Sequence, residues 1–321
     1  MKAESDWRSA AAGQTRLAFG QALLALAAID SRCVVVSADT QDLLGLRPFI
    51  QRYPQRFVEL GIAEQNAIGF AAGLASTGLR PFVCGYAPFL TARSMEQVRN
   101  DLAYARQRVV IGAAASGISL GVAGGTHHAL EDLALMRSLP NMTVIVPADA
   151  EEAYAATLAT RDINGPVYLR LGGRLDEPPV TARDAPYQLG RAIELRAGGD
   201  VAILACGCLV AAALNAAEQL QGDGIAARVL NMSSIKPLDQ AAIMRAATET
   251  GGIVCAEEHH LSGGLGGAVA ELLAAERPTR MRFVGMPDEF AAVGPTTALR
   301  SKYGMSAAGI TAACRDLLAA R

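Results

Sequence analysis

The chain has 321 residues, of which 51% are hydrophobic and only 5% aromatic. That length is enough for about two domains of ~150 residues each. The charged fraction is 19%, below the ~25% typical of soluble domains, which predicts that another subunit covers part of the surface. The formal net charge of -2 excludes a broad basic field of the kind that attracts nucleic acid.

The six cysteines lie mostly in apolar runs, and we expect them to be buried and reduced, as in the cytoplasm. Cys206 and Cys208 form a single Cys-x-Cys, which does not have the ligand spacing of a zinc site. Residues 1–12 are polar, are expected to fray, and do not resemble a signal peptide. No apolar run reaches the ~18 residues of a membrane helix. These features favour a cytoplasmic protein that binds neither nucleic acid nor membrane.

Short apolar runs alternate with amphipathic stretches from Thr15 to Arg170. Runs rich in β-branched residues, typical of buried parallel strands, predict strands at residues 33–36, 80–84, 109–111, 143–146 and 167–169. The stretches between them predict helices at residues 16–28, 64–76, 94–105 and 150–160. This alternation predicts a doubly wound α/β sheet.

Residues 174–185 interrupt this pattern with two prolines and mixed charges, which is typical of a linker. A second series of strands is expected at residues 201–205, 226–230, 252–256 and 281–284, with helices between them. The sequence therefore predicts two doubly wound α/β domains, at residues 1–178 and 186–321.

The most informative segment, residues 57–67, is a short strand that runs through a glycine turn into a helix. Glu64 opens that helix. A carboxylate there has a simple structural explanation, because it complements the helix dipole and contributes ~0.3–1 kcal/mol. The context favours a functional explanation instead.

That context is a set of short motifs. They are Thr15-Arg16, Ser37-Ala38-Asp39, Gly61-Ile62-Ala63-Glu64-Gln65-Asn66, Tyr86-Ala87-Pro88-Phe89, Gly124-Gly125-Thr126-His127-His128, Pro140-Asn141-Met142, Val146-Pro147-Ala148-Asp149, Gly165-Pro166-Val167-Tyr168-Leu169-Arg170 and Glu257-Glu258-His259. With these motifs in this order, the chain resembles the C-terminal half of transketolase, of 1-deoxyxylulose-5-phosphate synthase and of the β subunits of 2-oxoacid dehydrogenases. The resemblance extends from Thr15 to about Ala320. It implies a thiamine-diphosphate pyrimidine-binding domain followed by a transketolase C-terminal domain.

The resemblance implies that Glu64 hydrogen-bonds N1′ of the aminopyrimidine, so that the cofactor's own 4′-imino nitrogen removes the C2 proton. Ile62 would wedge the cofactor into its bent form. Tyr86 and Phe89 would lie against the pyrimidine ring, although both could be ordinary core aromatics. Asp39 would lie near the thiazolium, with a turn or a helix cap as its alternative.

Substrate-binding residues are implied in the same way. His127 follows two glycines and matches a family histidine that touches substrate oxygens and moves protons. His128 is expected to be structural. Arg16, Arg170 and Arg174 are candidates for gripping a sugar phosphate, because bidentate arginine suits phosphate. A structural or surface role remains equally open for each arginine.

Three positions depart from the family pattern of substrate readers. Ala123 stands where transketolases carry an Asp that reads a substrate hydroxyl, Ala115 replaces a donor-binding His, and Leu43 replaces a phosphate-binding Ser. Replacing hydrogen-bonding groups by Ala and Leu discriminates strongly against a normal hydroxyl pattern. We therefore expect a branched, deoxy or otherwise modified ketose, or a specialised acyloin reaction, rather than plain pentose-phosphate turnover.

Two loops could be mistaken for cofactor sites. Gly222-Asp223-Gly224 resembles the start of the Gly-Asp-Gly…Asn motif for Mg2+ and diphosphate, but Asn231 follows too soon, so a surface turn is expected. Residues 257–267 could bind an anion at a helix start, but a structural role is favoured. The Mg2+ site is therefore expected on another chain. The resemblance implies that this partner is an N-terminal transketolase subunit carrying Gly-Asp-Gly…Asn, in an α2β2 assembly.

The resemblance implies a transketolase subunit, active only with its partner, that transfers a two-carbon ketol unit from a phosphorylated ketose to an aldose phosphate. One alternative is a 2-oxoacid-decarboxylating or deoxyxylulose-phosphate-synthase-like subunit. The other is a scaffold subunit without catalytic function.

Overall fold

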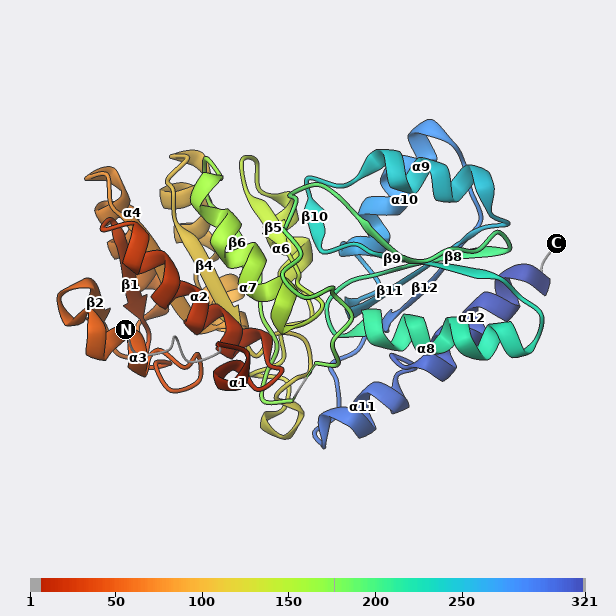
Figure 1. Ribbon diagram of the computed structural model, residues 1–321, viewed down its shortest axis with the longest axis horizontal. Coiled ribbons are helices and arrows are strands. Elements are labelled where there is room, and N and C mark those ends of the chain that lie inside the picture. Colours follow the sequence, from red (N-terminus) through yellow and green to blue (C-terminus); the bar gives the residue numbers. More distant parts are fainter. Residues whose placement is uncertain (1–6, 176, 320–321) are drawn as a thin grey trace.

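The computed structural model describes residues 7–175 and 177–319 as two α/β units that lie side by side along the long axis of the molecule (Figure 1). Both units are built on mainly parallel sheets with helices on both faces. This confirms the predicted fold class, because strands buried on both faces need a helical layer on each side.

The first sheet has seven strands in the order β10-β5-β6-β4-β3-β1-β2. Its strands are β1 (Cys33–Ser37), β2 (Phe57–Glu59), β3 (Arg80–Tyr86), β4 (Val110–Ala114), β5 (Thr143–Ile145), β6 (Val167–Arg170) and β10 (Ser234–Lys236). All neighbours are parallel except β10, which pairs antiparallel with β5. The five strands expected in the first half of the chain all form, within a few residues of the predicted bounds.

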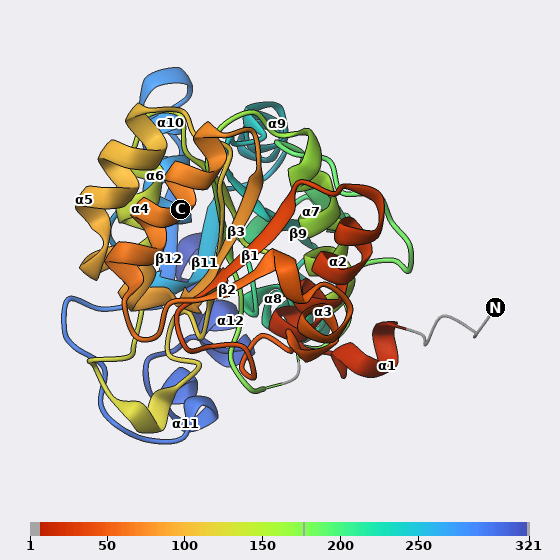
Figure 2. The same cartoon turned by 90° about the vertical axis from the view of Figure 1, so that its left-hand side faces the viewer.

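Helices cover both faces of this sheet. They are α1 (Trp7–Ala11), α2 (Thr15–Ile29), α3 (Arg47–Arg52), α4 (Glu64–Ser76), α5 (Met95–Gln97), α6 (Asp132–Ser138) and α7 (Ala150–Ala159). Figure 2 shows α2, α3 and α7 on one face and α4, α5 and α6 on the other. Short 3-10 turns lie at η1 (Pro54–Arg56), η4 (Gly121–Ala123) and η5 (Thr160–Asp162).

The helix expected at residues 94–105 is irregular. Two π-helical segments, η2 (Phe89–Arg93) and η3 (Val98–Tyr104), flank the short α5. Such wide turns carry an extra residue and occur frequently at functional sites. The fraying predicted for residues 1–12 is wrong for residues 7–11, because they form α1 and Trp7 stacks on Tyr154 with ring centroids 4.0 Å apart; residues 1–6 lie outside the described residues.

The second sheet has five strands in the order β12-β11-β8-β9-β7, with β7 antiparallel at one edge. Its strands are β7 (Ile193–Arg196), β8 (Val201–Ala205), β9 (Ala227–Asn231), β11 (Ile253–His260) and β12 (Met281–Met286). Its helices are α8 (Leu209–Gly222), α9 (Gln240–Glu249), α10 (Leu265–Glu276), α11 (Thr296–Lys302) and α12 (Ala307–Ala319). The four strands expected in this half are present.

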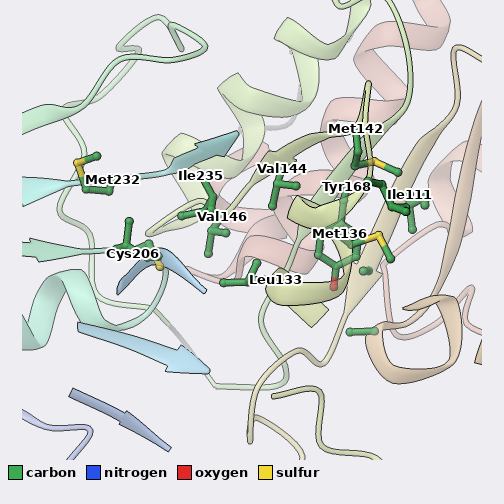
Figure 3. Packing of buried hydrophobic residues seen from close by; sticks show 14 of the residues in the cluster. Ile111, Leu133, Met136, Met142, Val144, Val146, Tyr168, Cys206, Met232 and Ile235 are labelled. Atoms are coloured by element: carbon green, nitrogen blue, oxygen red, sulfur yellow. The ribbon is translucent and has the colours of Figure 1, made fainter. Parts of the chain in front are cut away.

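One strand crosses between the two units. β10 follows β9 in the chain but joins the first sheet at its β5 edge. Ile235 on β10 and Val144 on β5 belong to one cluster of buried side chains, which continues to Met232 and Cys206 of the second unit (Figure 3). The two domains therefore share a continuous hydrophobic core.

Among the described residues, no helix combines the length and the apolar character that a bilayer crossing requires.

Candidate functional site

Glu64 lies at the first position of α4 and is only 3% exposed. It follows a sharp turn in which Gly61 adopts φ +70°, a conformation that favours glycine. The next residue, Ile62, is 75% exposed. A buried carboxyl group and an exposed apolar side chain, two residues apart, are an arrangement suited to holding a ligand that is partly polar and partly apolar.

Arg93 is the partner of that carboxyl group. Its Nη1 donates to Glu64 Oε2 at 2.8 Å, and its guanidinium carbon lies 4.0 Å from the centre of the Phe89 ring. Phe89 and Arg93 are the first and last residues of the π-helical segment η2, four positions apart. Arg93 therefore links Glu64 to the aromatic part of the site.

Three rings meet beside this pair. The Tyr86 and Phe89 centroids are 6.0 Å apart, those of Phe89 and His127 are 5.2 Å apart, and those of Tyr86 and His127 are 6.1 Å apart, all with edge-to-face geometry. Tyr86 ends β3, and all three rings are only partly buried. Half-open aromatic faces of this kind can pack against a flat heterocycle.

His127 lies in a loop that leaves and re-enters the fold at a single point, where Gly117 and Ala129 exchange backbone hydrogen bonds of 2.9 Å in both directions. Within the loop, Nδ1 of His127 lies 3.0 Å from Thr126 Oγ1. The neighbouring His128 is 4% exposed, and burial lowers its pKa. His128 is thus placed as an uncharged packing residue, whereas His127 faces the aromatic rings.

Asp39 lies beside the same site at the end of β1. It is exposed and has φ +54°, which Asp tolerates better than most residues. Its backbone N–H donates to Glu59 Oε1 at 2.8 Å, and Glu59 Oε1 accepts a second bond from the N–H of Gly61 at 2.8 Å. Glu59 therefore ties the loop after β1 to the loop after β2.

The structure thus brings Asp39, Ile62, Glu64, Tyr86 and Phe89 to the carboxyl ends of neighbouring parallel strands. This is the edge of an α/β sheet at which ligands bind. His127 joins them from the loop after β4.

The candidate arginines are placed differently. Arg170 is 6% exposed and donates to both Asp132 oxygens, at 2.7 and 3.0 Å, and to the carbonyls of Ala129 and Glu258, at 3.0 and 2.9 Å. All of this bonding is internal, so we leave Arg170 out of the proposed substrate site. Its role is to join α6, the His127 loop and the second domain.

Arg16 is similarly engaged. It is 8% exposed and donates from Nε to the carbonyl of Gly173 at 2.7 Å, and from its terminal nitrogens to the carbonyl of Leu43 and to Gln14. Burial, and secondarily the charge of Arg174, lower its pKa. Arg174 is exposed, so it is the candidate arginine that remains available for a phosphate.

The substituted positions differ in the room they offer. Ala115 is fully buried with φ +57°, and Leu43 is 6% exposed with its carbonyl bound by Arg16. Ala123 is exposed at the end of η4, four residues before His127. Only Ala123 of these three could exchange its side chain for a larger polar group without repacking the core.

The two loops that the sequence analysis rejected as cofactor sites have structural roles. Glu257 accepts hydrogen bonds from the N–H groups of Leu265 and Gly266, at 2.7 and 2.8 Å, so a carboxylate of the chain itself occupies the N-terminus of α10. Asp223 lies in the turn after α8 and accepts from Arg315 Nε at 2.9 Å.

Two residues of the site were not anticipated. Arg93 was missed because its link to Glu64 joins residues 29 positions apart in the chain, a contact that no local pattern predicts. Glu59 was missed because a carboxylate at the end of a strand has no distinguishing local pattern. The only signal for Arg93 was an arginine four residues after Phe89.

The donor set fits the aminopyrimidine end of thiamine diphosphate. An aminopyrimidine is a flat heterocycle with a ring nitrogen that needs a carboxyl partner, and the thiazolium attached to it is a second flat ring that carries a positive charge. Glu64 supplies the carboxyl, Tyr86 and Phe89 supply ring faces, and the exposed Ile62 supplies an apolar wedge. Among the residues that the structure describes, no group of three His, Cys, Asp or Glu side chains could hold a metal ion.

Comparison with known proteins agrees with this fit. The family described as transketolase, pyrimidine binding domain, matches residues 12–175, and the family described as transketolase, C-terminal domain, matches residues 190–310. The chain is 43% identical over 296 residues to a subunit of the apulose-4-phosphate transketolase of Phocaeicola vulgatus, covering 92% of this chain and 94% of that one. It is 41% identical over 297 residues to the 6-deoxy-6-sulfo-D-fructose transketolase subunit of a Clostridium species, covering 92% and 91%.

A solved structure described as a split gene transketolase, inactive beta4 tetramer, superimposes with a TM-score of 0.90 at 43% identity, covering 95% of this chain and 98% of that one. Both domain families and these full-length similarities agree with the architecture seen here. The chain belongs to the transketolase family and corresponds to the pyrimidine-binding subunit of a split, thiamine-diphosphate-dependent transketolase.

Proposed function

We propose that this chain supplies the catalytic carboxyl group, Glu64, and the pyrimidine slot of a two-subunit transketolase that moves a two-carbon ketol unit from a modified, phosphorylated ketose to an aldose phosphate. The observation that carries the proposal is the buried Glu64 beside the exposed Ile62 and the half-open rings of Tyr86 and Phe89. These groups combine a proton donor with a surface for a flat ring.

Thiamine diphosphate, when bound, supplies the carbanion chemistry that breaks the bond next to a ketose carbonyl. Each residue has a separate part in that work. Glu64 holds a proton at the ring nitrogen of the pyrimidine, and Tyr86 and Phe89 orient the ring. Ile62 would pack between the two rings of the cofactor, and Asp39 would lie on the side of the cationic ring.

His127 is proposed to act on the substrate. Its ring packs against Phe89 at 5.2 Å, so it lies beside the pyrimidine slot, where it can exchange protons with substrate oxygens. Arg174 is exposed, and its positive charge lies close enough to Arg16 to lower the pKa of Arg16. It is the proposed contact for a substrate phosphate.

A partner subunit is proposed to hold Mg2+ and the diphosphate through carboxylate and carbonyl oxygens, with α2β2 stoichiometry. One face of α4 supports such a partner. Gly69 and Gly73 lie in the helix interior, and each costs ~1 kcal/mol relative to Ala. A Cβ on Gly73 would meet nothing within 4 Å, and Phe70 between them is 38% exposed. The packing within this chain does not explain why glycine occupies these two positions beside an exposed aromatic ring. Both glycines are explained if the backbone of another chain approaches this face of α4.

The solved split transketolase is described as inactive in the form of a β4 tetramer. We extend that to this chain, so that activity requires the N-terminal partner. The six free cysteines, five of them buried, are compatible with the cytoplasm, where we place the complex.

The substrate class is inferred from Ala123. An alanine at this exposed position, in the loop that carries His127, cannot hydrogen-bond a substrate hydroxyl, so a ketose lacking a normal hydroxyl there is favoured. The names of two relatives refer to apulose 4-phosphate and 6-deoxy-6-sulfofructose, both unusual ketoses.

The direct test measures the exchange of the C2 proton of thiamine diphosphate in the assembled complex. NMR monitors this exchange after the complex is transferred to D2O. Glu64→Gln should slow this exchange by roughly 10²–10⁴-fold, the range typical of general acid–base groups. The matched control is Gln65→Glu, which moves a carboxyl to the exposed neighbouring position and should not rescue Glu64→Gln. Undiminished exchange in Glu64→Gln would refute the proposed role, and CO2 release from pyruvate would favour the decarboxylating alternative.

A further inference from the structure

The loop that carries His127 is held from outside its own domain. Residues 117–129 leave the first sheet after β4, and their base is closed by the backbone pair between Gly117 and Ala129. Next to that base, the backbone N–H of His260 on β11 donates to the carbonyl of Leu130 at 2.8 Å. The second domain therefore reaches the loop directly.

Glu258, the residue two places before His260, makes the central contact. It is 3% exposed, and its Oε1 accepts a hydrogen bond from the backbone N–H of Ile118 at 2.9 Å. The carboxylate fills the space beside Gly117, where an added Cβ would lie 2.2 Å from Glu258 Oε1. Gly117 also has φ +60°, so backbone conformation and space both require glycine at this position.

A second contact holds the loop further along. Thr296, at the start of α11, donates from Oγ1 to the carbonyl of Ile118 at 3.0 Å and accepts from the N–H of Gly121 at 3.4 Å. The N–H of Gly294 donates to the carbonyl of Gly121 at 3.1 Å. Backbone groups of the loop and its base, on Ile118, Gly121 and Leu130, thus find their partners in the second domain.

Glu258 is itself fixed by a buried cluster. Its Oε2 accepts from Arg300 Nε and, at 3.2 Å, from the thiol of Cys208. Arg170 from β6 donates to the carbonyl of Glu258 at 2.9 Å and to that of Ala129 at 3.0 Å. A carboxylate held by one arginine and one thiol on one side presents its other oxygen to the loop in a single orientation.

We infer that Glu258 is a positioning residue that sets the conformation of the His127 loop, and that the second domain serves the reaction by clamping this loop through Glu258 and Thr296. This inference rests on the proposed function of His127. The reaction slows when the loop that carries a proton-transfer group moves out of place. A displacement of that group by ~1 Å can lower the reaction rate by ~10²-fold.

The chain offers a matched control in the adjacent residue. Glu257 has the same side chain, the same 3% exposure and the same strand, but its two hydrogen bonds run to α10 within the second domain. Glu257→Ala and Glu258→Ala therefore both remove a buried carboxylate, and only Glu258→Ala releases the loop.

The first measurement is hydrogen–deuterium exchange of the chain without partner or cofactor. Glu258→Ala should raise exchange within residues 117–130, and Glu257→Ala should raise it around α10 instead. The second measurement is steady-state kinetics of the assembled complex with an aldose phosphate as acceptor and hydroxypyruvate as donor, a 2-oxoacid that delivers the two-carbon unit with release of CO2. Glu258→Ala should lower kcat by roughly tenfold or more without changing the Kd of thiamine diphosphate. Glu257→Ala should lower Tm and leave kcat unchanged.

Two further variants keep the inference falsifiable if Glu258→Ala does not fold. Thr296→Val preserves the shape of the side chain but removes the hydroxyl that holds Ile118 and Gly121, so it should also raise loop exchange and lower kcat. Glu258→Gln retains an oxygen for the N–H of Ile118 and should recover part of the lost kcat.

The inference is overturned if Thr296→Val leaves loop exchange and kcat as in the wild type, or if a folded Glu258→Ala behaves like Glu257→Ala. His127→Ala separates this failure from failure of the proposed function. If His127→Ala retains full kcat, the proposed role of His127 is wrong; if it loses activity while the Glu258 and Thr296 variants do not, the clamp alone is wrong.

Discussion

Arg93 donates to Glu64 at 2.8 Å while its guanidinium lies 4.0 Å from the centre of the Phe89 ring. One side chain thus fixes both the proposed proton donor and one wall of the pyrimidine slot. Stacking on the ring costs the guanidinium none of its hydrogen bonds, because those lie in its own plane.

Replacing Arg93 by Met should therefore weaken cofactor binding more than it destabilises the fold. Glu64 would keep its buried position without its charged partner, so we expect a loss of about 1 kcal/mol in unfolding free energy and a several-fold weaker Kd for thiamine diphosphate in the complex. Denaturant unfolding and calorimetric titration measure the two effects. Arg99→Met, at an exposed residue whose side chain bonds to the neighbouring Asn100, is the control and should change neither quantity. Wild-type cofactor affinity in Arg93→Met would contradict this assignment.

Substitution of Arg170 should affect the stability of the fold, whereas substitution of Arg174 should affect substrate binding. Arg170→Met removes the partner of Asp132, which is fully buried, and loss of one member of a buried pair costs ~3–5 kcal/mol. Arg174→Met should leave unfolding free energy unchanged and raise KM for a phosphorylated donor by roughly tenfold, because an arginine–phosphate contact is a charge-assisted bond. An Arg170→Met protein of wild-type stability, or an Arg174→Met protein of wild-type KM, would count against the respective role.

Glu177 should make the stability of the chain depend on pH. It is 8% exposed, bonded to the N–H of Thr15 at 3.0 Å, and burial raises its pKa from 4.5 to about 7. Because the folded state binds this proton more tightly than the unfolded state, its contribution to stability is full below pH ~4.5. As the pH rises from ~4.5 to ~7, this contribution to the unfolding free energy falls by at most roughly 3 kcal/mol.

Glu177→Gln removes that titration, so the difference in unfolding free energy between variant and wild type should shift in the variant's favour from pH 5 to pH 8. Urea unfolding at fixed protein concentration across this range measures the difference. Glu276→Gln, at the exposed end of α10, should follow the wild-type curve. A constant difference between Glu177→Gln and wild type would show that Glu177 does not titrate in this window.

Ala123 offers a test of substrate class. It is exposed, so Ala123→Asp can be accommodated without repacking and would add a hydrogen-bonding group to the loop that carries His127. We expect kcat/KM for xylulose 5-phosphate with ribose 5-phosphate to rise by about tenfold in the assembled complex, in keeping with one added hydrogen bond to a substrate hydroxyl. Efficient turnover of this pair by the wild-type complex would instead refute the expected preference for a modified ketose.

Much of the secondary structure followed closely from local patterns. The start of α4 at Glu64 was predicted because a glycine turn precedes an alanine-rich helix, and β8 was predicted at its observed bounds because a five-residue apolar run is typical of a buried strand. Tyr86, Phe89 and His127 were expected at one site only through the family resemblance, and the structure brings their ring centroids to within 5.2–6.1 Å of one another.

The sequence by itself determined the two α/β domains, the family and the position of Glu64, because strand and helix periodicity and short motifs are local properties of the chain. Only the tertiary structure decided that β10 joins the first sheet, that Arg170 bonds internally while Arg174 stays exposed, and that Glu258 reaches Ile118, 140 residues away. The physical reason is that the partners of a long polar side chain are chosen by which backbone groups the packed domains leave unsatisfied, and no local pattern encodes those distances.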